Sequence, residues 1–143
     1  MKKYFLLLLF PAVLLLSGCG GANTGSPASG GVAKSGKNLS YPTLYNQENL
    51  PQYSDAKLVQ IISDGPTLKE GVLLRLESSK DVKTISAYYD DQMAKLGWTM
   101  PAVNTPTEAS YATQYEKGAK YIQMTVSSLD GKTQTITLSL MQK

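Results

Sequence analysis

The feature that most constrains the fold of this chain is one change of hydrophobic period. Apolar side chains recur at intervals of three and four residues at Val82, Ile85, Tyr89, Met93 and Leu96. This spacing places them on one face of an amphipathic helix. Before and after this segment, apolar and polar residues alternate instead, which is the period of a half-buried strand. The chain is therefore predicted to hold one helix among several strands.

The predicted helix has recognisable ends. Ser79 or Asp81 can cap the free N–H groups of the first turn. Gly97 can adopt the left-handed conformation that ends a helix. Trp98 follows directly, and we expect it to fold back onto Met93. The Gly-Trp pair is interpreted as a structural clasp.

Strands are predicted on both sides of the helix, with turns at residues 63–66 and at Asp130-Gly131. The predicted strands are residues 57–62, 69–77, 98–100, 110–116, 120–128 and 133–141. The residues expected to point inward are Ile122, Met124, Val126, Ile136, Leu138 and Leu140. Val72, Leu74 and Leu76 share one face of their strand, and Tyr111, Thr113 and Tyr115 share one side of theirs. The expected fold is an α+β two-layer domain, with one amphipathic helix packed on an antiparallel sheet of about five to six strands. The pattern does not separate a meander from an order in which the first of these strands pairs with the last.

The beginning of the chain has a different composition. Lys2 and Lys3 precede an apolar run over residues 4–16, and small residues and the single cysteine follow it. A basic segment, a short apolar segment and a small-residue cleavage site form a secretory signal. Residues 20–38 are mostly small or polar and are predicted to be a flexible tether. A segment rich in tyrosine and leucine then leads into the domain, and the interpretation preferred for it is that it packs along the domain edge.

The motif Leu16-Ser17-Gly18-Cys19 resembles the lipobox of bacterial lipoproteins. The resemblance implies that Cys19 carries a diacylglyceryl group, that the signal is removed before it, and that the new amino terminus is acylated, typically with palmitate. Two or three acyl chains anchor a protein stably in a membrane. Gly20 stands where many inner-membrane lipoproteins carry an Asp retention signal. The implied location is the outer membrane of a Gram-negative cell, or the outer surface of the single membrane of a Gram-positive cell.

Three units are therefore expected: a lipoprotein signal peptide at 1–18, the lipidated Cys19 with its tether and connecting segment at 19–49, and a folded domain at 50–143. Removing the signal leaves 14 − 2 = 12 basic against 11 acidic residues. The lysines are scattered, so no nucleic-acid partner is expected. No cysteine remains for a disulfide framework, so the domain must rely on its apolar core.

Residues 50–140 resemble a domain of many uncharacterised bacterial lipoproteins and secreted proteins. The motifs are LPQY at 50–53, YY at 88–89 and LGW at 96–98. Ser54 departs from the pattern, because a second proline often stands there. The order of elements is also similar to that of the helix-on-sheet domains of outer-membrane assembly accessory lipoproteins. These are packing motifs, so the resemblance implies a fold and no activity.

The residue types of this chain give little indication of a catalytic activity. The chain has no histidine, which excludes serine–histidine and cysteine–histidine constellations. The S-x-x-K pattern at 54–57 and the G-K-T pattern at 131–133 lack the other motifs of their enzyme classes, and the second is interpreted as a hairpin turn. Asp90 and Asp91 are interpreted as a solvated helix face. Arg75, the only arginine, is expected to make a cross-strand pair, although it could also hold a carboxylate or phosphate.

The function expected from these observations is that of a membrane-anchored envelope lipoprotein acting as a non-catalytic interaction or accessory domain. No enzyme activity, cofactor or metal is expected. Its partner would be another envelope component, bound through the sheet edge or a surface of tyrosines and threonines. The alternative is a surface domain that binds a glycan or peptide through Tyr111, Tyr115 and Tyr121. That alternative requires the three rings to be exposed on one face.

Overall fold

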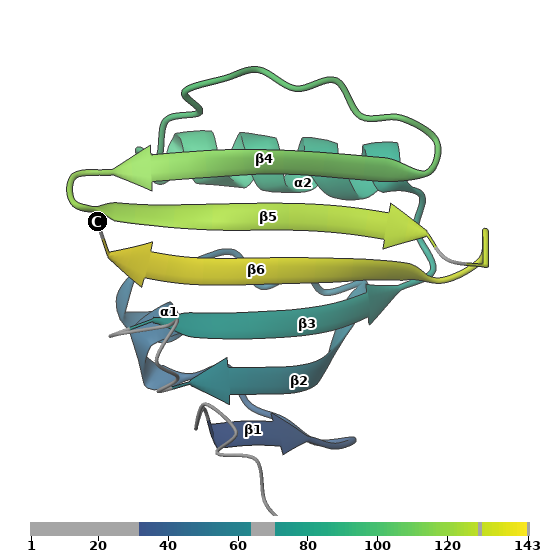
Figure 1. The fold of residues 1–143 in the computed structure, drawn as a ribbon, viewed down its shortest axis with the longest axis horizontal. Helices are drawn as coiled ribbons and strands as arrows, with labels where there is room; N and C mark the ends of the chain where they lie inside the picture. Colours follow the sequence, from purple (N-terminus) through teal and green to yellow (C-terminus); the bar gives the residue numbers. More distant parts are fainter. Residues whose placement is uncertain (1–31, 64–70, 129, 143) are drawn as a thin grey trace, which may run out of the picture.

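The computed structural model describes residues 32–63, 71–128 and 130–142. They form a six-stranded antiparallel sheet with two helices (Figure 1). The strands are β1 (Val32–Ser35), β2 (Ala56–Ser63), β3 (Val72–Ser78), β4 (Ser110–Lys117), β5 (Lys120–Ser128) and β6 (Gln134–Gln142). The helices are α1 (Thr43–Gln47) and α2 (Val82–Lys95). The described fold is dominated by its sheet. The antiparallel sheet and helix α2 are confirmed, but the expectation of a single helix is wrong, because α1 was not predicted.

The strand order is β1-β2-β3-β6-β5-β4, which is neither of the two orders that the sequence left open. The second predicted strand, β3, pairs with the last one, β6, with Leu74 opposite Leu138 and Leu76 opposite Ile136. The β2–β3 hairpin and the β4–β5–β6 meander are thus joined by the pairing of β3 with β6. The inward apolar residues of these two strands lie directly opposite one another. The predicted strand at 98–100 is reduced to a single bridge between Thr99 and Glu116.

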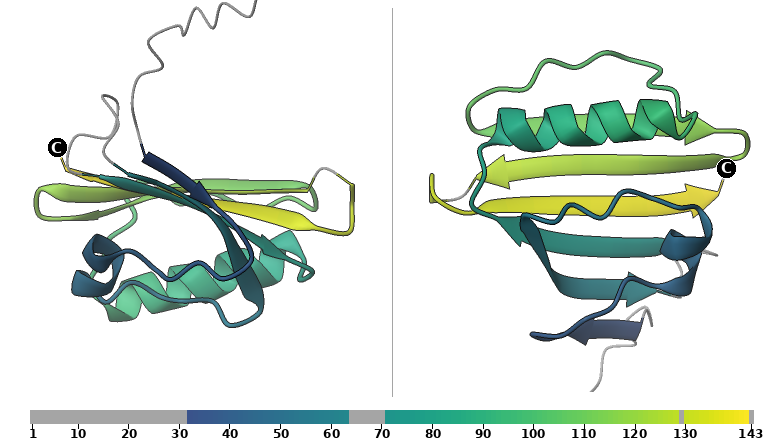
Figure 2. Two further views of the ribbon diagram at one scale, coloured as in Figure 1. Left: turned by 90° about the horizontal axis from the view of Figure 1, so that it is seen from below. Right: turned by 180° about the vertical axis from the view of Figure 1, so that it is seen from behind.

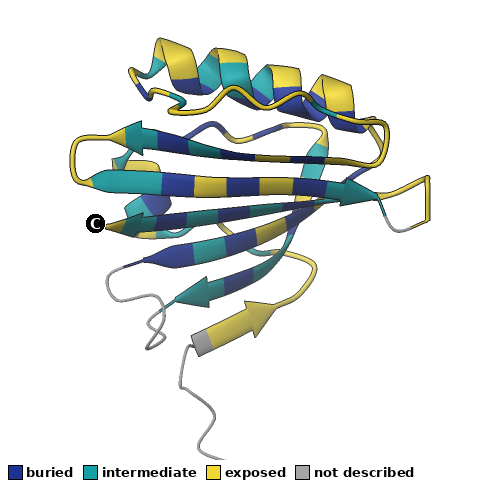
Figure 3. Ribbon diagram, turned by 45° about the horizontal axis from the view of Figure 1, so that its top comes forward, coloured by how far each residue is buried: buried dark blue, intermediate teal, exposed yellow. Residues whose placement is uncertain are grey.

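Both helices lie on the same face of the sheet (Figure 2, left). Helix α2 packs over β4 and β5. Burial alternates along the strands, as Figure 3 shows, and all the residues expected to point inward are buried. The other face of the sheet carries side chains such as Arg75, Gln123 and Thr125, which are exposed. The core therefore lies between the helices and one face of the sheet, and the second face is open.

The ends of α2 confirm the predicted signals. Asp81 is the N-cap, and its Oδ1 accepts a 2.8 Å hydrogen bond from the N–H of Thr84. Gly97 has a φ of 78°, and the N–H of Trp98 donates to the C=O of Met93 at 3.0 Å. This bond belongs to the Schellman motif. It turns the chain so that Trp98 is buried in the core.

Ordered structure begins earlier than the predicted domain boundary at residue 50. Residues 32–35 pair with β2, although the tether was predicted to reach residue 38. Tyr45 in α1 is 1% exposed, and its hydroxyl donates to the C=O of Pro51 at 2.7 Å. The prediction of a flexible tether from composition is wrong for residues 32–35, because strand pairing satisfies backbone groups and needs few apolar side chains. Cys19, the predicted signal and most of the predicted turn at 63–66 lie outside the described residues.

No helix within the described ranges is long and apolar enough to cross a membrane.

Candidate functional site at the edge of strand β4

Strand β4 forms one edge of the sheet (Figure 1). Its register with β5 places Lys117 opposite Lys120 across a two-residue turn. In such a hairpin the residues flanking the turn exchange hydrogen bonds, and every second residue after them does the same. The backbone groups of Ala112, Gln114 and Glu116 therefore point away from β5, toward the free edge.

The segment before β4 covers two points of this edge. Thr99 and Glu116 exchange backbone hydrogen bonds of 2.9 Å and 2.7 Å. Further along, the side-chain amide of Asn104 donates to the C=O of Ala112 at 2.6 Å. Between these points lies Gln114, whose backbone N–H and C=O have no partner among the described residues. The edge is thus closed at both ends and open in the middle.

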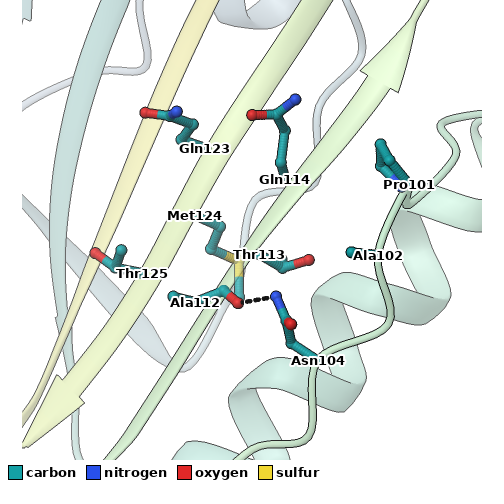
Figure 4. A pocket seen from close by; sticks show the side chains of 9 residues that line it. All are labelled: Pro101, Ala102, Asn104, Ala112, Thr113, Gln114, Gln123, Met124 and Thr125. Atoms are coloured by element: carbon teal, nitrogen blue, oxygen red, sulfur yellow. Dashed lines mark hydrogen bonds between the residues drawn. The ribbon is translucent and has the colours of Figure 1, made fainter.

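A hollow of about 470 Å³ lies at this opening (Figure 4). That volume is within the ordinary range of ligand sites, about 300–1,000 Å³. The lining residues are Pro101, Ala102, Asn104, Ala112, Thr113, Gln114, Gln123, Met124 and Thr125. None of them is charged, and they offer amides, hydroxyls and small apolar groups. This lining suits a neutral, polar ligand.

Thr113 contributes an unsatisfied hydroxyl to the hollow. The residue is 6% exposed, and its Oγ1 has no hydrogen-bond partner among the described residues. In Figure 4 this hydroxyl points toward the covering segment at Ala102. A buried polar group without a partner costs free energy.

Two tyrosines on the inner face hold β4 against α2. The hydroxyl of Tyr111 donates to both carboxylate oxygens of Asp90, at 2.9 Å and 3.1 Å, and that of Tyr115 donates to Oδ1 at 2.6 Å. Burial, together with the neighbouring Asp90 carboxylate, raises the pKa of Tyr111 to about 12. Burial, with the same carboxylate, also raises the pKa of Tyr115. Both hydroxyls therefore stay protonated as donors at neutral pH.

The predicted tyrosine surface is not formed. Tyr111 is 3% exposed and Tyr115 is 1% exposed, both on the side of the sheet that the helices cover. Tyr121 has the opposite parity on β5 and lies on the open face, where its hydroxyl is 3.5 Å from the sulfur of Met141. Because side chains alternate along a strand, these three rings cannot share one surface. The glycan or peptide site built on them is therefore wrong.

The adjacent aspartates have different surroundings. Asp91 pairs with Lys95 one turn away, as a solvated helix face predicts. Asp90 is only partly exposed and accepts hydrogen bonds from both inner tyrosines, so the interpretation of the pair is wrong for Asp90. A signal existed in the sequence, because Asp90 stands eight residues after Val82 and four after Ser86, beside the apolar stripe. A carboxylate at that position needs a partner.

The other motifs have structural roles. Arg75 lies opposite Gln60 and Thr137 in the neighbouring strands, and it forms no ion pair among the described residues. The S-x-x-K pattern at 54–57 lies in a turn and the start of β2, whereas the penicillin-binding enzymes need its serine at a helix start. The G-K-T pattern at 131–133 is the predicted turn, with Gly131 at a φ of 71°.

A second hollow, of about 420 Å³, lies at the start of β2. It is lined by charged side chains, including Lys57 and Glu77, and by serines. Lys80 and Asp55 form an ion pair of 3.6 Å beside it. The described part of the chain holds no group of three or more acidic, histidine or cysteine residues that could bind a metal.

A scan against protein-family models finds no match, and searches of curated proteins and of solved structures find none either. The function is therefore argued from the residues and from the geometry of the β4 edge.

Proposed function

We propose that this chain is a lipid-anchored protein of the bacterial cell envelope that acts as a non-catalytic interaction domain. The observation that carries the proposal is the motif Leu16-Ser17-Gly18-Cys19 behind a basic and an apolar segment. Acyl chains on Cys19 would hold the protein at the membrane, at the outer membrane in a Gram-negative cell. We assign its domain to the two-layer α+β class, with the helices as one layer.

Strand β1, the described element nearest to Cys19 in the sequence, lies at the sheet edge opposite β4. Cys19 and Val32 are 32 − 19 = 13 residues apart, so at most about 45 Å of chain separates them. Strands β1 and β4 are the two edges of the sheet. Neighbouring strands are about 4.8 Å apart, so five spacings put these edges about 24 Å from each other. The connection to Cys19 is thus long enough to leave the β4 edge accessible to a partner.

The residue types support an interaction role over catalysis. The sequence has no histidine to serve as a general base at neutral pH. Its single cysteine is assigned to the anchor. The β4 edge offers neutral hydrogen-bonding groups instead, which recognise a partner without reacting with it. We propose no nucleic-acid partner and no cofactor.

The proposal is tested in cells that express the full chain. Wild type is expected to incorporate a labelled palmitate and to fractionate with membranes. Cys19→Ala is expected to lose the label and leave the membrane fraction. Gly18→Ala, which keeps a small residue before the cysteine, serves as the matched control and should stay labelled. A wild-type protein that carries no acyl label would contradict the proposal.

The interaction role is tested by crosslinking in the same cells, followed by mass spectrometry. We expect a discrete envelope protein to be captured with wild type and lost with Cys19→Ala. Recovery of glycan fragments with no protein would instead contradict the interaction proposed here. The three-tyrosine site is not proposed again, because Tyr111 and Tyr115 are buried.

A further inference from the structure

We propose that the β4 edge at Gln114 binds a short, uncharged, extended peptide segment of a partner protein. This inference rests on the proposed function, because it names the chemical class of the partner. The site consists of the open backbone groups of Gln114, the N–H of Ala112 and the hollow beside them.

The backbone of Gln114 fits a peptide residue. Its N–H and C=O both point to the free edge and lie on either side of one Cα, which is the arrangement found in an antiparallel hydrogen-bonded pair. A partner must therefore supply a C=O and an N–H in the reverse order around one centre. An extended peptide residue does so. A single acetamido group, such as the one on an N-acetylated sugar, has its N–H and C=O on one planar amide and satisfies only one of the two.

The contacts that Thr99 and Asn104 make with β4 limit the length of the peptide that can pair with this edge. Glu116 already exchanges hydrogen bonds with Thr99, so pairing cannot continue past it. In the other direction, the C=O of Ala112 accepts from Asn104 and only its N–H is left. One complete residue pair and one additional hydrogen bond therefore fit along the edge. A long added strand does not.

The lining favours an uncharged segment. No lysine, arginine, aspartate or glutamate is among the lining residues, so a charged side chain entering the hollow would lose water without gaining a counter-charge. The side chain of Gln114 does not block the opening, because its amide donates to the Glu116 carboxylate at 2.6 Å along the strand.

The test uses ¹⁵N-labelled full-length chain extracted in detergent. The first probe is the blocked neutral peptide acetyl-Ala-Thr-Val-Thr-Ala-amide. We expect it to shift the amide signals of Gln114 and Ala112 and to leave those of β1 unchanged. The same peptide N-methylated at its three central residues cannot donate to the Gln114 C=O and should bind about tenfold more weakly. A version with glutamate at both threonine positions should also bind more weakly.

Two variants separate the backbone from the side chain. Gln114→Pro removes the edge N–H at a position where an edge strand tolerates proline, and it should weaken binding by about tenfold. Gln114→Ala keeps the N–H and should bind as wild type does. If Gln114→Pro does not fold, the N-methylated peptide still tests the same hydrogen bonds.

Three results would overturn the inference. They are the absence of any shift at Gln114 up to about 10 mM peptide, equal binding of the N-methylated peptide, and an equal shift with the trimer of N-acetylglucosamine. None of them depends on acylation, so failure of this inference is distinguishable from failure of the anchor proposal. The anchor proposal fails only through Cys19 and the palmitate label.

Discussion

The hydroxyl of Tyr115 in β4 donates a 2.6 Å hydrogen bond to Oδ1 of Asp90 in α2. Tyr111, four residues earlier on the same face of β4, donates to the same carboxylate. This cluster joins the helix to the edge strand that carries the hollow. It is a polar contact at the margin of an otherwise apolar interface, so its loss should be felt in both stability and the site.

Replacing Asp90 tests that contact. Asp90→Ala removes the carboxylate acceptor of both hydroxyls and leaves them only the weak sulfur acceptors of Met100 and Met124. It should lower the free energy of unfolding by about 2 kcal/mol. Asp90→Asn keeps an acceptor oxygen and should lose less. Asp91→Ala is the matched control, because this neighbour contacts only the exposed side chains of Lys95 and Gln92 and should leave stability nearly unchanged. Urea denaturation measures all three, and equal effects of the two alanine variants would contradict the assignment.

Stability should fall at alkaline pH. The pKa of Tyr111 rises from 10.0 to about 12 on folding. Between these values the unfolded chain releases the proton while the folded chain keeps it. The contribution of Tyr111 to stability is therefore fully present below about pH 10 and is lost as the pH approaches 12. Tyr111→Phe should show a shallower decline over this window. Urea midpoints at pH 9, 10 and 11 provide the measurement, and identical slopes would disprove the prediction.

Gly97 should be the costly glycine at the end of α2. Its φ of 78° is a conformation that other residues adopt at a cost of about 1 to 2 kcal/mol, and no atom would crowd an added Cβ. Gly97→Ala should therefore destabilise through backbone conformation alone. Gly36→Ala, where an added Cβ also meets open space and no positive φ is recorded, should not destabilise the fold. Thermal unfolding of the two variants makes the comparison.

The two faces of β6 should respond differently to truncation of a side chain. Leu138 is buried under the helices, and Leu138→Ala should cost about 2 to 5 kcal/mol. Thr137 is its neighbour on the open face, and Thr137→Ala should change stability by about 0.5 kcal/mol or less. Urea denaturation compares them. A large effect at Thr137 would indicate that the open face is covered.

The position of the domain boundary can be tested by truncation. A chain that begins at residue 50 lacks Tyr45, which fills the core, and lacks the strand that pairs with β2. It should be less stable than a chain that begins at residue 32 by about 3 kcal/mol or more. Equal unfolding midpoints for the two chains would restore the boundary at residue 50.

The local structure could be predicted from the sequence alone. The alternation in β3 to β6, the stripe on α2, the cap at Asp81 and the turn at Gly97 could all be predicted, because each depends on residues close together in the chain. The parity of Tyr121 was also readable, since it precedes the inward Ile122. Placing it with Tyr111 and Tyr115 was an error of interpretation, and the information needed to avoid it was present.

How these elements combine depends on contacts between parts of the chain that are distant in sequence. The pairing of β3 with β6 brings together strands that are far apart in the sequence, and several orders would bury the same apolar residues. The pairing of residues 32–35 with β2 depends on backbone hydrogen bonds that leave no apolar pattern. The opening at Gln114 exists because Thr99 and Asn104 bond to Glu116 and Ala112 of the edge, and the residue between these two has no such partner. Such an opening depends on how two segments lie beside each other, so it cannot be predicted from the sequence of either segment alone.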